Sequence, residues 1–123
     1  MKLSDHNPIE EVEKIKEEYF NGPSYSFQSG QAYYMPFEDR VNVPPKKDFE
    51  DVHEYYSTLF HEIVHSTGHK DRLDRDGVTG KISFGSENYS KEELIAELGA
   101  SMLCGVTGIG NQTIDNSASY IQS

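Results

Sequence analysis

Two histidines and a glutamate in one short stretch of the chain have the spacing of a site for metal binding and proton transfer. The segment Thr58 to His69 reads TLFHEIVHSTGH and contains the pattern His61-Glu62-x-x-His65. Residues four apart lie on the same face of a helix, so both imidazoles can reach one ion. Glu62 then lies beside that ion, where its carboxylate can accept a proton from water. The pattern therefore predicts a zinc site, with Glu62 as the catalytic base, if the segment is helical.

The apolar residues around this pattern indicate that it lies on a buried helix. We expect the helix to run from Phe49 to Thr67 and to end at Gly68 as its C-cap. Its apolar residues are Tyr55, Tyr56, Leu59, Phe60, Ile63 and Val64, of which the last three are expected to face the core. The alternative is that the histidines are ordinary solvated side chains. It fits this setting poorly, because burying two unpaired imidazoles and a carboxylate is costly without a metal.

A catalytic zinc ion takes three protein ligands and leaves one position for water, so a third ligand must be found. The candidates are His69, Glu93 and Glu97. His69 follows His65 by one helical step, but Gly68 is expected to end the helix before it. Glu93 and Glu97 lie four apart on a second expected helix and face the same way. We prefer Glu93 as the ligand, with Glu97 as the hydrogen-bond partner of a ligating histidine or as the alternative ligand.

The second helix is expected to begin at Ser90 and to end near Gly105. Ser90 and Glu93 have the spacing of a capping box, so closing that box is the alternative role of Glu93, and a surface carboxylate is the alternative for Glu97. Small residues would let this helix approach the first one closely: Ala96, Gly99 and Ala100. Its expected apolar face consists of Leu94, Ile95, Leu98 and Met102. Cys104, the only cysteine, excludes an internal disulfide and is interpreted as a core residue.

The remaining segments predict a small sheet and one further helix. A helix is expected from Asn7-Pro8 to about Phe20, followed by an extended piece at Ser24 to Phe27. Gln31 to Met35 and Arg40 to Val43 are expected to form an antiparallel hairpin. Residues 69–89 are expected to be irregular, and a short helix is expected from Asp115. The acidic residues of the irregular segment do not fit a calcium loop, because non-carboxylate residues stand where ligands are required; they are Asp71, Asp74 and Asp76.

The composition describes one polar domain without a membrane span. The chain has 123 residues, a hydrophobic content of 35% and a formal net charge of −10. It contains no run of about 18 apolar residues. The start, MKLSDHNPIEE, lacks the apolar segment of a signal peptide, so we expect a cytoplasmic protein. The negative charge argues against direct nucleic acid binding, which needs a basic surface. An acidic mimic of DNA is a further interpretation, but the acidic residues are spread over many segments.

Three stretches stand in a specific order and spacing: YYSTLFHEIVHSTGHKDRL, FGSENYSKEELIAELGASMLC and GIGNQTIDNSASYIQS. They resemble the zincin-like metallopeptidase domain of ArdC-type antirestriction proteins, which recurs in polyvalent proteins of plasmids, phages and conjugative elements. The resemblance extends from about Gln31 to Ser123. It implies an α+β gluzincin fold, in which a small antiparallel sheet packs on the HExxH helix and a second helix supplies a glutamate. Gluzincins carry Glu-x-x-Ala-Asp there. Residues 93–97 (ELIAE) match with Glu97 in place of the aspartate, which supports Glu93 as the ligand.

The chain departs from that family in two respects. ArdC-type proteins carry an N-terminal domain that binds single-stranded DNA, for which this chain has no room. Family members also continue past the equivalent of Ser123 into further helix. We therefore expect residues 1–123 to form a single zincin-like domain that is truncated at its C-terminus, with additional domains possible in a full-length protein.

Two functional hypotheses follow. In the first, the domain is a zinc metallopeptidase of a mobile genetic element, linked to antirestriction, with a protein or peptide as its substrate. His61, His65 and Glu93 would hold Zn²⁺, and Glu62 would transfer the proton. In the second, the domain keeps its zinc but acts as a non-proteolytic binding or inhibitory module against host defence proteins. The presence of Glu62 favours chemistry, because a structural zinc does not need it.

Overall fold

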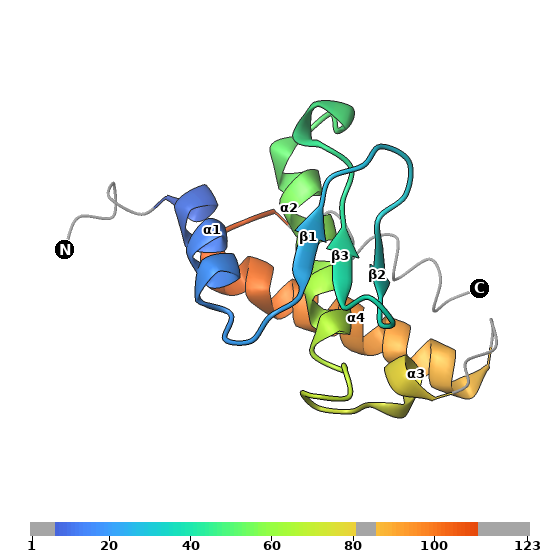
Figure 1. The fold of residues 1–123 in the computed structure, drawn as a ribbon. Coiled ribbons are helices and arrows are strands. Elements are labelled where there is room, and N and C mark those ends of the chain that lie inside the picture. Colours follow the sequence, from blue (N-terminus) through green and yellow to red (C-terminus); the bar gives the residue numbers. More distant parts are fainter. Residues whose placement is uncertain (1–6, 81–85, 111–123) are drawn as a thin grey trace.

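The computed structural model of the chain describes residues 7–80 and 86–110, which form an α+β fold (Figure 1). The helices are α1 (Pro8–Glu18), α2 (Val52–Ser66), the short α3 (Asp76–Thr79) and α4 (Glu87–Thr107), and a 3-10 turn, η2, spans Lys46–Asp48. The strands are β1 (Ser24–Ser26), β2 (Tyr33–Met35) and β3 (Arg40–Asn42). No helix within these two ranges is long and apolar enough to cross a membrane. The expected short helix from Asp115 lies outside the described residues.

Helix α2 is the centre of the fold. It packs against the sheet on one side and against α4 on the other, as Figure 1 shows. Its side chains Tyr56, Leu59 and Phe60 are fully buried, and Ile63 and Val64 are buried as well, as expected. The helix begins at Asp51, whose side chain accepts a hydrogen bond from the backbone N–H of His53 at 2.8 Å. Helix α2 therefore starts three residues after Phe49, the expected first residue, because η2 and the Asp51 cap precede it.

The expectation that Gly68 is the C-cap of this helix is wrong. The capping residue is Thr67, which keeps a right-handed helical conformation with φ −64°. Gly68 is buried and lies against the segment that follows α2. A Cβ atom there would lie 2.6 Å from a methyl group of Val78 and 3.0 Å from the Arg75 guanidinium carbon. A glycine is therefore needed at this position for close packing rather than for a turn.

Helix α4 begins and ends further out than expected. Its N-cap is Ser86, whose hydroxyl accepts a hydrogen bond from the backbone N–H of Tyr89, and Gly108 ends it in the left-handed conformation with φ 88°. Ser90 is thus inside the helix. The capping-box role for Glu93 is wrong, and that carboxylate is available for other contacts.

The face that α4 buries is the one with small side chains. Ala96, Ala100 and Cys104 are buried against α2, and a Cβ atom on Gly99 would lie 2.8 Å from both methyl groups of Val64. The expected apolar face is instead exposed: Leu94, Ile95, Leu98 and Met102. The pattern was misleading because the contact with α2 is so close that only small residues fit, and the large apolar residues lie on the outer side.

The three strands form one sheet in the order β1-β3-β2. The expected antiparallel pairing of β2 with β3 is confirmed, with Tyr34 opposite Val41. Strand β1 pairs with β3 in parallel, which the sequence did not predict. The buried side chain of Asn42 supports this arrangement by accepting hydrogen bonds from Ser26 and from the backbone N–H of Gln28, and by donating to the backbone carbonyls of Gln28 and Gln31. Strand β2 is left at the edge of the sheet.

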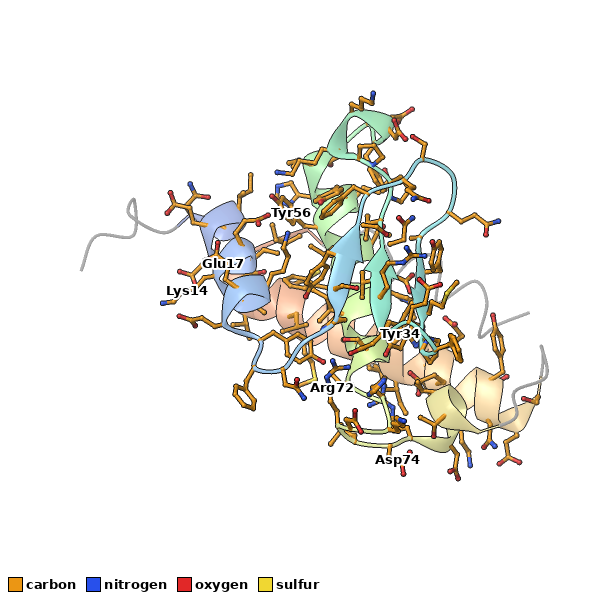
Figure 2. The ribbon with its side chains drawn as sticks, viewed as in Figure 1. Lys14, Glu17, Tyr34, Tyr56, Arg72 and Asp74 are labelled. Atoms are coloured by element: carbon orange, nitrogen blue, oxygen red, sulfur yellow. The ribbon has the colours of Figure 1, made fainter. Side chains whose placement is uncertain are left out.

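Arg72 joins the sheet to the end of α2. Its guanidinium donates two hydrogen bonds to Asp39, at 2.9 and 2.7 Å, and one to the backbone carbonyl of Ser66 at 2.8 Å. It also donates to the carbonyl of Asn21, which follows α1. Asp39 in turn accepts a hydrogen bond from Tyr34, and Figure 2 shows Arg72 and Tyr34 at the same end of the sheet. These bonds hold β2 in place relative to α2.

Candidate metal centre

The side chains of His61, His65 and Glu93 come together between α2 and α4. Each offers a ligand atom, and the three atoms lie within 4.8 Å of one another. The Glu93 carboxylate spans the two rings, with one oxygen 3.2 Å from Nε2 of His61 and the other 3.4 Å from Nε2 of His65. Both histidines therefore turn the same ring nitrogen toward one point, which is the arrangement that a shared ion requires.

The other ring nitrogen of each histidine is held by a further glutamate of α4. Nδ1 of His61 lies 2.7 Å from Glu97, and Nδ1 of His65 lies 2.7 Å from Glu92. A carboxylate at this distance accepts the Nδ1–H, which leaves Nε2 as the atom that can bind a metal. The structure thus places Glu97 on the outer nitrogen of His61, away from the point that Glu93 faces.

The carboxylates around His61 and His65 favour the binding of a cation, either a proton or a metal ion, to the two rings. Burial alone would lower the pKa of His61, but its hydrogen bonds with Glu93 and Glu97 raise that pKa to about 10. For His65, burial is likewise outweighed by Glu92 and Glu93, which raise its pKa to about 9. Burial alone would raise the pKa of Glu93, but the two imidazoles outweigh this effect and lower that pKa to about 2. A proton and a metal ion therefore compete for the same ring nitrogens.

Glu62 lies beside these residues and does not contribute to the three-atom group. It is buried, at 8% exposure, and it lines a cavity of about 460 Å³ together with His61 and His65. Burial raises the pKa of Glu62, while the two imidazoles lower it less strongly. A carboxylate with a raised pKa is a better proton acceptor near neutral pH than an ordinary one.

The cavity is bounded by β2 and by the segment around α3. Its other lining residues are Ala32, Tyr33, Tyr34, Pro36, Gly77, Val78, Tyr89, Glu92 and Glu93. Since β2 is an edge strand, one side of its backbone is not paired within the described sheet. The cavity therefore joins the histidines and Glu62 to an open strand edge.

His69 is not brought into the three-atom group. Its Nδ1 accepts a hydrogen bond from the backbone N–H of Asp71 at 3.1 Å. The acidic residues of the following segment form no metal-binding group with other residues of the described chain; Asp71 and Asp74 are exposed. The choice of Glu93 over His69 as third ligand thus agrees with the placement of the side chains and remains a prediction for the bound state.

Sequence reasoning missed two residues at this site, Glu92 and Arg75. Glu92 precedes Ala96 and Ala100 by one and two helical turns, so its place on the buried stripe of α4 could have been read from the spacing. Arg75 gave no such signal, because it lies in a segment without periodicity. It reaches Glu92 with two hydrogen bonds, at 2.9 and 3.0 Å.

The donor set fits a divalent transition metal. Two neutral imidazoles and one carboxylate are the ligands of many catalytic zinc sites, and three protein ligands leave room for water. The orientation of the rings supports the fit. Glu97 and Glu92 each lie 2.7 Å from an Nδ1 atom, so the Nε2 atoms of both histidines stay on the side of Glu93.

The chain is similar in sequence to a known protein family and to several known proteins. The profile of a family described as zincin-like metallopeptidase matches residues 11–123. Two Escherichia coli proteins named DNA primase TraC are similar: one is 42% identical over 93 residues, and the other is 36% identical over 118. These matches cover 76% and 95% of this chain and 8% of each primase. The protein y4eC of Sinorhizobium fredii is 41% identical over 93 residues, covering 76% of this chain and 29% of y4eC.

Two crystal structures are also similar, both of the antirestriction protein ArdC from plasmid R388. The Mn(II)-bound structure has a TM-score of 0.70 and 38% identity, covering 92% of this chain and 40% of that one. The metal-free structure has a TM-score of 0.68, also with 38% identity. The chain therefore spans less than half the length of these relatives.

Proposed function

Because the chain belongs to the zincin-like metallopeptidase family, we propose that it is a peptidase domain that hydrolyses peptide bonds with zinc as its cofactor. His61, His65 and Glu93 are the residues that would hold the ion. A bound zinc ion would lower the pKa of a water molecule and polarise the carbonyl of the peptide bond. The observation that carries the proposal is the convergence of both Nε2 atoms on the Glu93 carboxylate, with Glu62 buried beside them.

Glu62 is proposed as the catalytic base. Its carboxylate would take the proton from the attacking water and deliver it to the amine that leaves. Its raised pKa suits both steps, because the group must accept a proton and then release it near neutral pH.

The substrate is proposed to be an extended segment of a protein. Strand β2 lies at the sheet edge and contributes Tyr33 and Tyr34 to the cavity. A peptide that paired with this edge would run along the cavity past the histidines, and backbone hydrogen bonds would align it. We place this activity in antirestriction, because similar crystal structures are those of an antirestriction protein.

The experiment is a comparison of Glu62→Gln with the unsubstituted chain. After loading with zinc, both are incubated with a library of unstructured peptides, and cleavage is followed by mass spectrometry. Glu62→Gln should bind zinc normally and lose cleavage by a factor of about 10² to 10⁴, since the amide cannot accept the proton. Glu54→Gln is the matched control, because Glu54 is exposed on the same helix and should leave cleavage unchanged.

A different result would favour the alternative function. The peptidase proposal fails if no peptide is cleaved by the zinc-loaded chain while antirestriction in cells survives Glu62→Gln. The domain would then act as a zinc-stabilised binding or inhibitory module.

A further inference from the structure

Arg75 makes an unusually complete set of contacts for a residue between two helices. Its Nε donates to one oxygen of Glu92 at 2.9 Å, and its Nη2 donates to the other at 3.0 Å. Its Nη1 donates to the Thr67 hydroxyl at 2.7 Å, and Nη2 also donates to the backbone carbonyl of Val64 at 2.9 Å. One guanidinium therefore binds the C-terminal end of α2 and a carboxylate of α4 simultaneously.

Glu92 transmits this anchoring to one histidine. The Glu92 side chain is only 5% exposed, and the oxygen that meets Nη2 of Arg75 also lies 2.7 Å from Nδ1 of His65. The Arg75 fork fixes both oxygens of the carboxylate, so the carboxylate cannot rotate without breaking a charge-assisted bond. Glu92 thus fixes the orientation of the His65 ring through Nδ1, and Nε2 of His65 points toward Glu93.

The local packing is built to allow this arrangement. A Cβ atom on Gly77 would lie 2.6 Å from Cβ of Glu92, so the segment carrying Arg75 approaches α4 as closely as only glycine permits. His61 has no equivalent support. Its partner Glu97 has one oxygen on the ring and the other, Oε2, without a hydrogen-bond partner in the described part of the chain.

We propose that Arg75 is a positioning residue of the metal centre, which locks Glu92 so that His65 presents its Nε2 atom to the ion. This inference rests on the proposed function only in requiring a metal at this site. The fork geometry is essential to it. A lysine would keep the positive charge but could not hold both oxygens of Glu92 in one plane.

The test measures zinc affinity and the state of each imidazole. Arg75→Lys and the unsubstituted chain are compared by competition for zinc with a chelating dye, and by ¹H–¹⁵N NMR of the histidine rings in the zinc-loaded protein. Arg75→Lys should weaken zinc binding by about 10- to 100-fold, the usual effect of losing an outer support. The Nδ1–H signal of His65 should shift or broaden, while that of His61 stays unchanged.

Arg72→Lys is the matched control, because Arg72 also grips a carboxylate through two nitrogens but does so away from the histidines. It should lower the melting temperature and leave zinc affinity and both ring signals unchanged. If Arg75→Lys does not fold, Glu92→Gln provides the second variant, with the same expected shift at His65. Unchanged affinity and an unchanged His65 signal in either variant would overturn the inference.

The outcomes also separate this inference from the proposed function. Zinc binding that depends on Arg75, in a chain that cleaves no peptide, would leave the inference standing and remove the peptidase. Normal cleavage and normal zinc binding in Arg75→Lys would overturn the inference and leave the peptidase proposal standing. A chain that binds no zinc would overturn both.

Discussion

The Glu97 carboxylate lies 2.7 Å from Nδ1 of His61, on the opposite side of the ring from the Nε2 atom that Glu93 faces at 3.2 Å. Two glutamates one helical turn apart on α4 thus bind the two nitrogens of a single imidazole. The two glutamates therefore have different roles. Glu93 is placed to bind an ion, and Glu97 is placed to orient the histidine that binds it.

The first prediction compares these two carboxylates. Glu93→Ala should weaken zinc affinity by more than about 100-fold because it removes a ligand, whereas Glu97→Ala should weaken it by about 10- to 100-fold. Chelator competition measures both. His69→Ala is the control and should change the affinity little, since its ring contacts the backbone of Asp71 instead. The assignment is wrong if His69→Ala is the most damaging of the three.

The second prediction concerns the effect of metal on stability. The chain should bind about one zinc ion, and zinc at 100 times its dissociation constant should stabilise the fold by about 2.7 kcal/mol. Removal by EDTA should then lower the melting temperature by roughly 10 °C in differential scanning fluorimetry. Mn(II) should give a smaller shift, because imidazole-containing sites bind it more weakly than zinc. The melting temperature of Glu93→Ala, which lacks a proposed ligand, should not respond to zinc or EDTA. The same lack of response in the unsubstituted chain would contradict the metal site.

The third prediction tests the close contact between α2 and α4. Gly99→Ala would place a methyl group 2.8 Å from both Val64 methyls, so it should destabilise the fold by about 0.5–2 kcal/mol in urea unfolding. Gly105→Ala on the same helix is the control. Its Cβ would meet nothing within 4 Å, and it should stabilise by about 0.5–1 kcal/mol through helix propensity. Val64→Ala should rescue part of the loss in Gly99→Ala, and an absence of coupling would contradict this account.

The parts of the fold with local signals were predictable. Asn7-Pro8 marks the start of α1 because its side chain caps the helix, and HExxH lies on a buried helix because the surrounding residues are apolar. The antiparallel pairing of β2 and β3 follows from a short connecting turn. In each case the deciding interaction lies within a few residues of the signal.

The parts that depend on distant contacts were not predictable. The buried face of α4 is the small-residue face because α2 lies so close, and periodicity cannot report how near a neighbouring helix will come. Strands β1 and β3 are neighbours in the sheet but not in the sequence, because β2 comes between them along the chain and lies on the other side of β3. Arg75 binds Glu92 across 17 positions of sequence, from a segment with no repeating pattern. Its role could be read only once the two segments were seen together.

The fourth prediction is a pH dependence that comes from Asp39. Burial raises the pKa of Asp39, but hydrogen bonds from Arg72 and Tyr34 outweigh it and hold that pKa below its ordinary value. A lowered pKa in the folded state stabilises the protein above the unfolded pKa of about 3.9, and this contribution is lost as the pH falls through the folded value. Asp39→Asn should therefore cost about 1.5–3 kcal/mol at pH 7 and progressively less below pH 4.

Urea unfolding at several pH values measures this difference. Asparagine tolerates the positive φ of 50° at this position, so the backbone is not strained by the change. Glu38→Gln is the control, because the Glu38 ion pair with Arg40 is half exposed and should contribute less than about 1 kcal/mol at any pH. A cost for Asp39→Asn that is equal at pH 7 and pH 3 would contradict the prediction.

The contact between Gly99 and Val64 also fixes how far α4 can slide along α2. Glu93 and Glu97 are four residues apart, about 6 Å along the helix axis, so a slip of one turn would bring Glu97 near the place of Glu93. In that alignment Ser101 would stand where Glu97 is and Ala96 where Glu92 is, so the ion would keep a carboxylate ligand while both histidines would lose their Nδ1 partners. Such a slip would bring Leu103 toward Val64 in place of Gly99, and no side chain of that size fits there. A single glycine thus holds the two helices in the one alignment in which a bound ion would have both its carboxylate ligand and two oriented histidines.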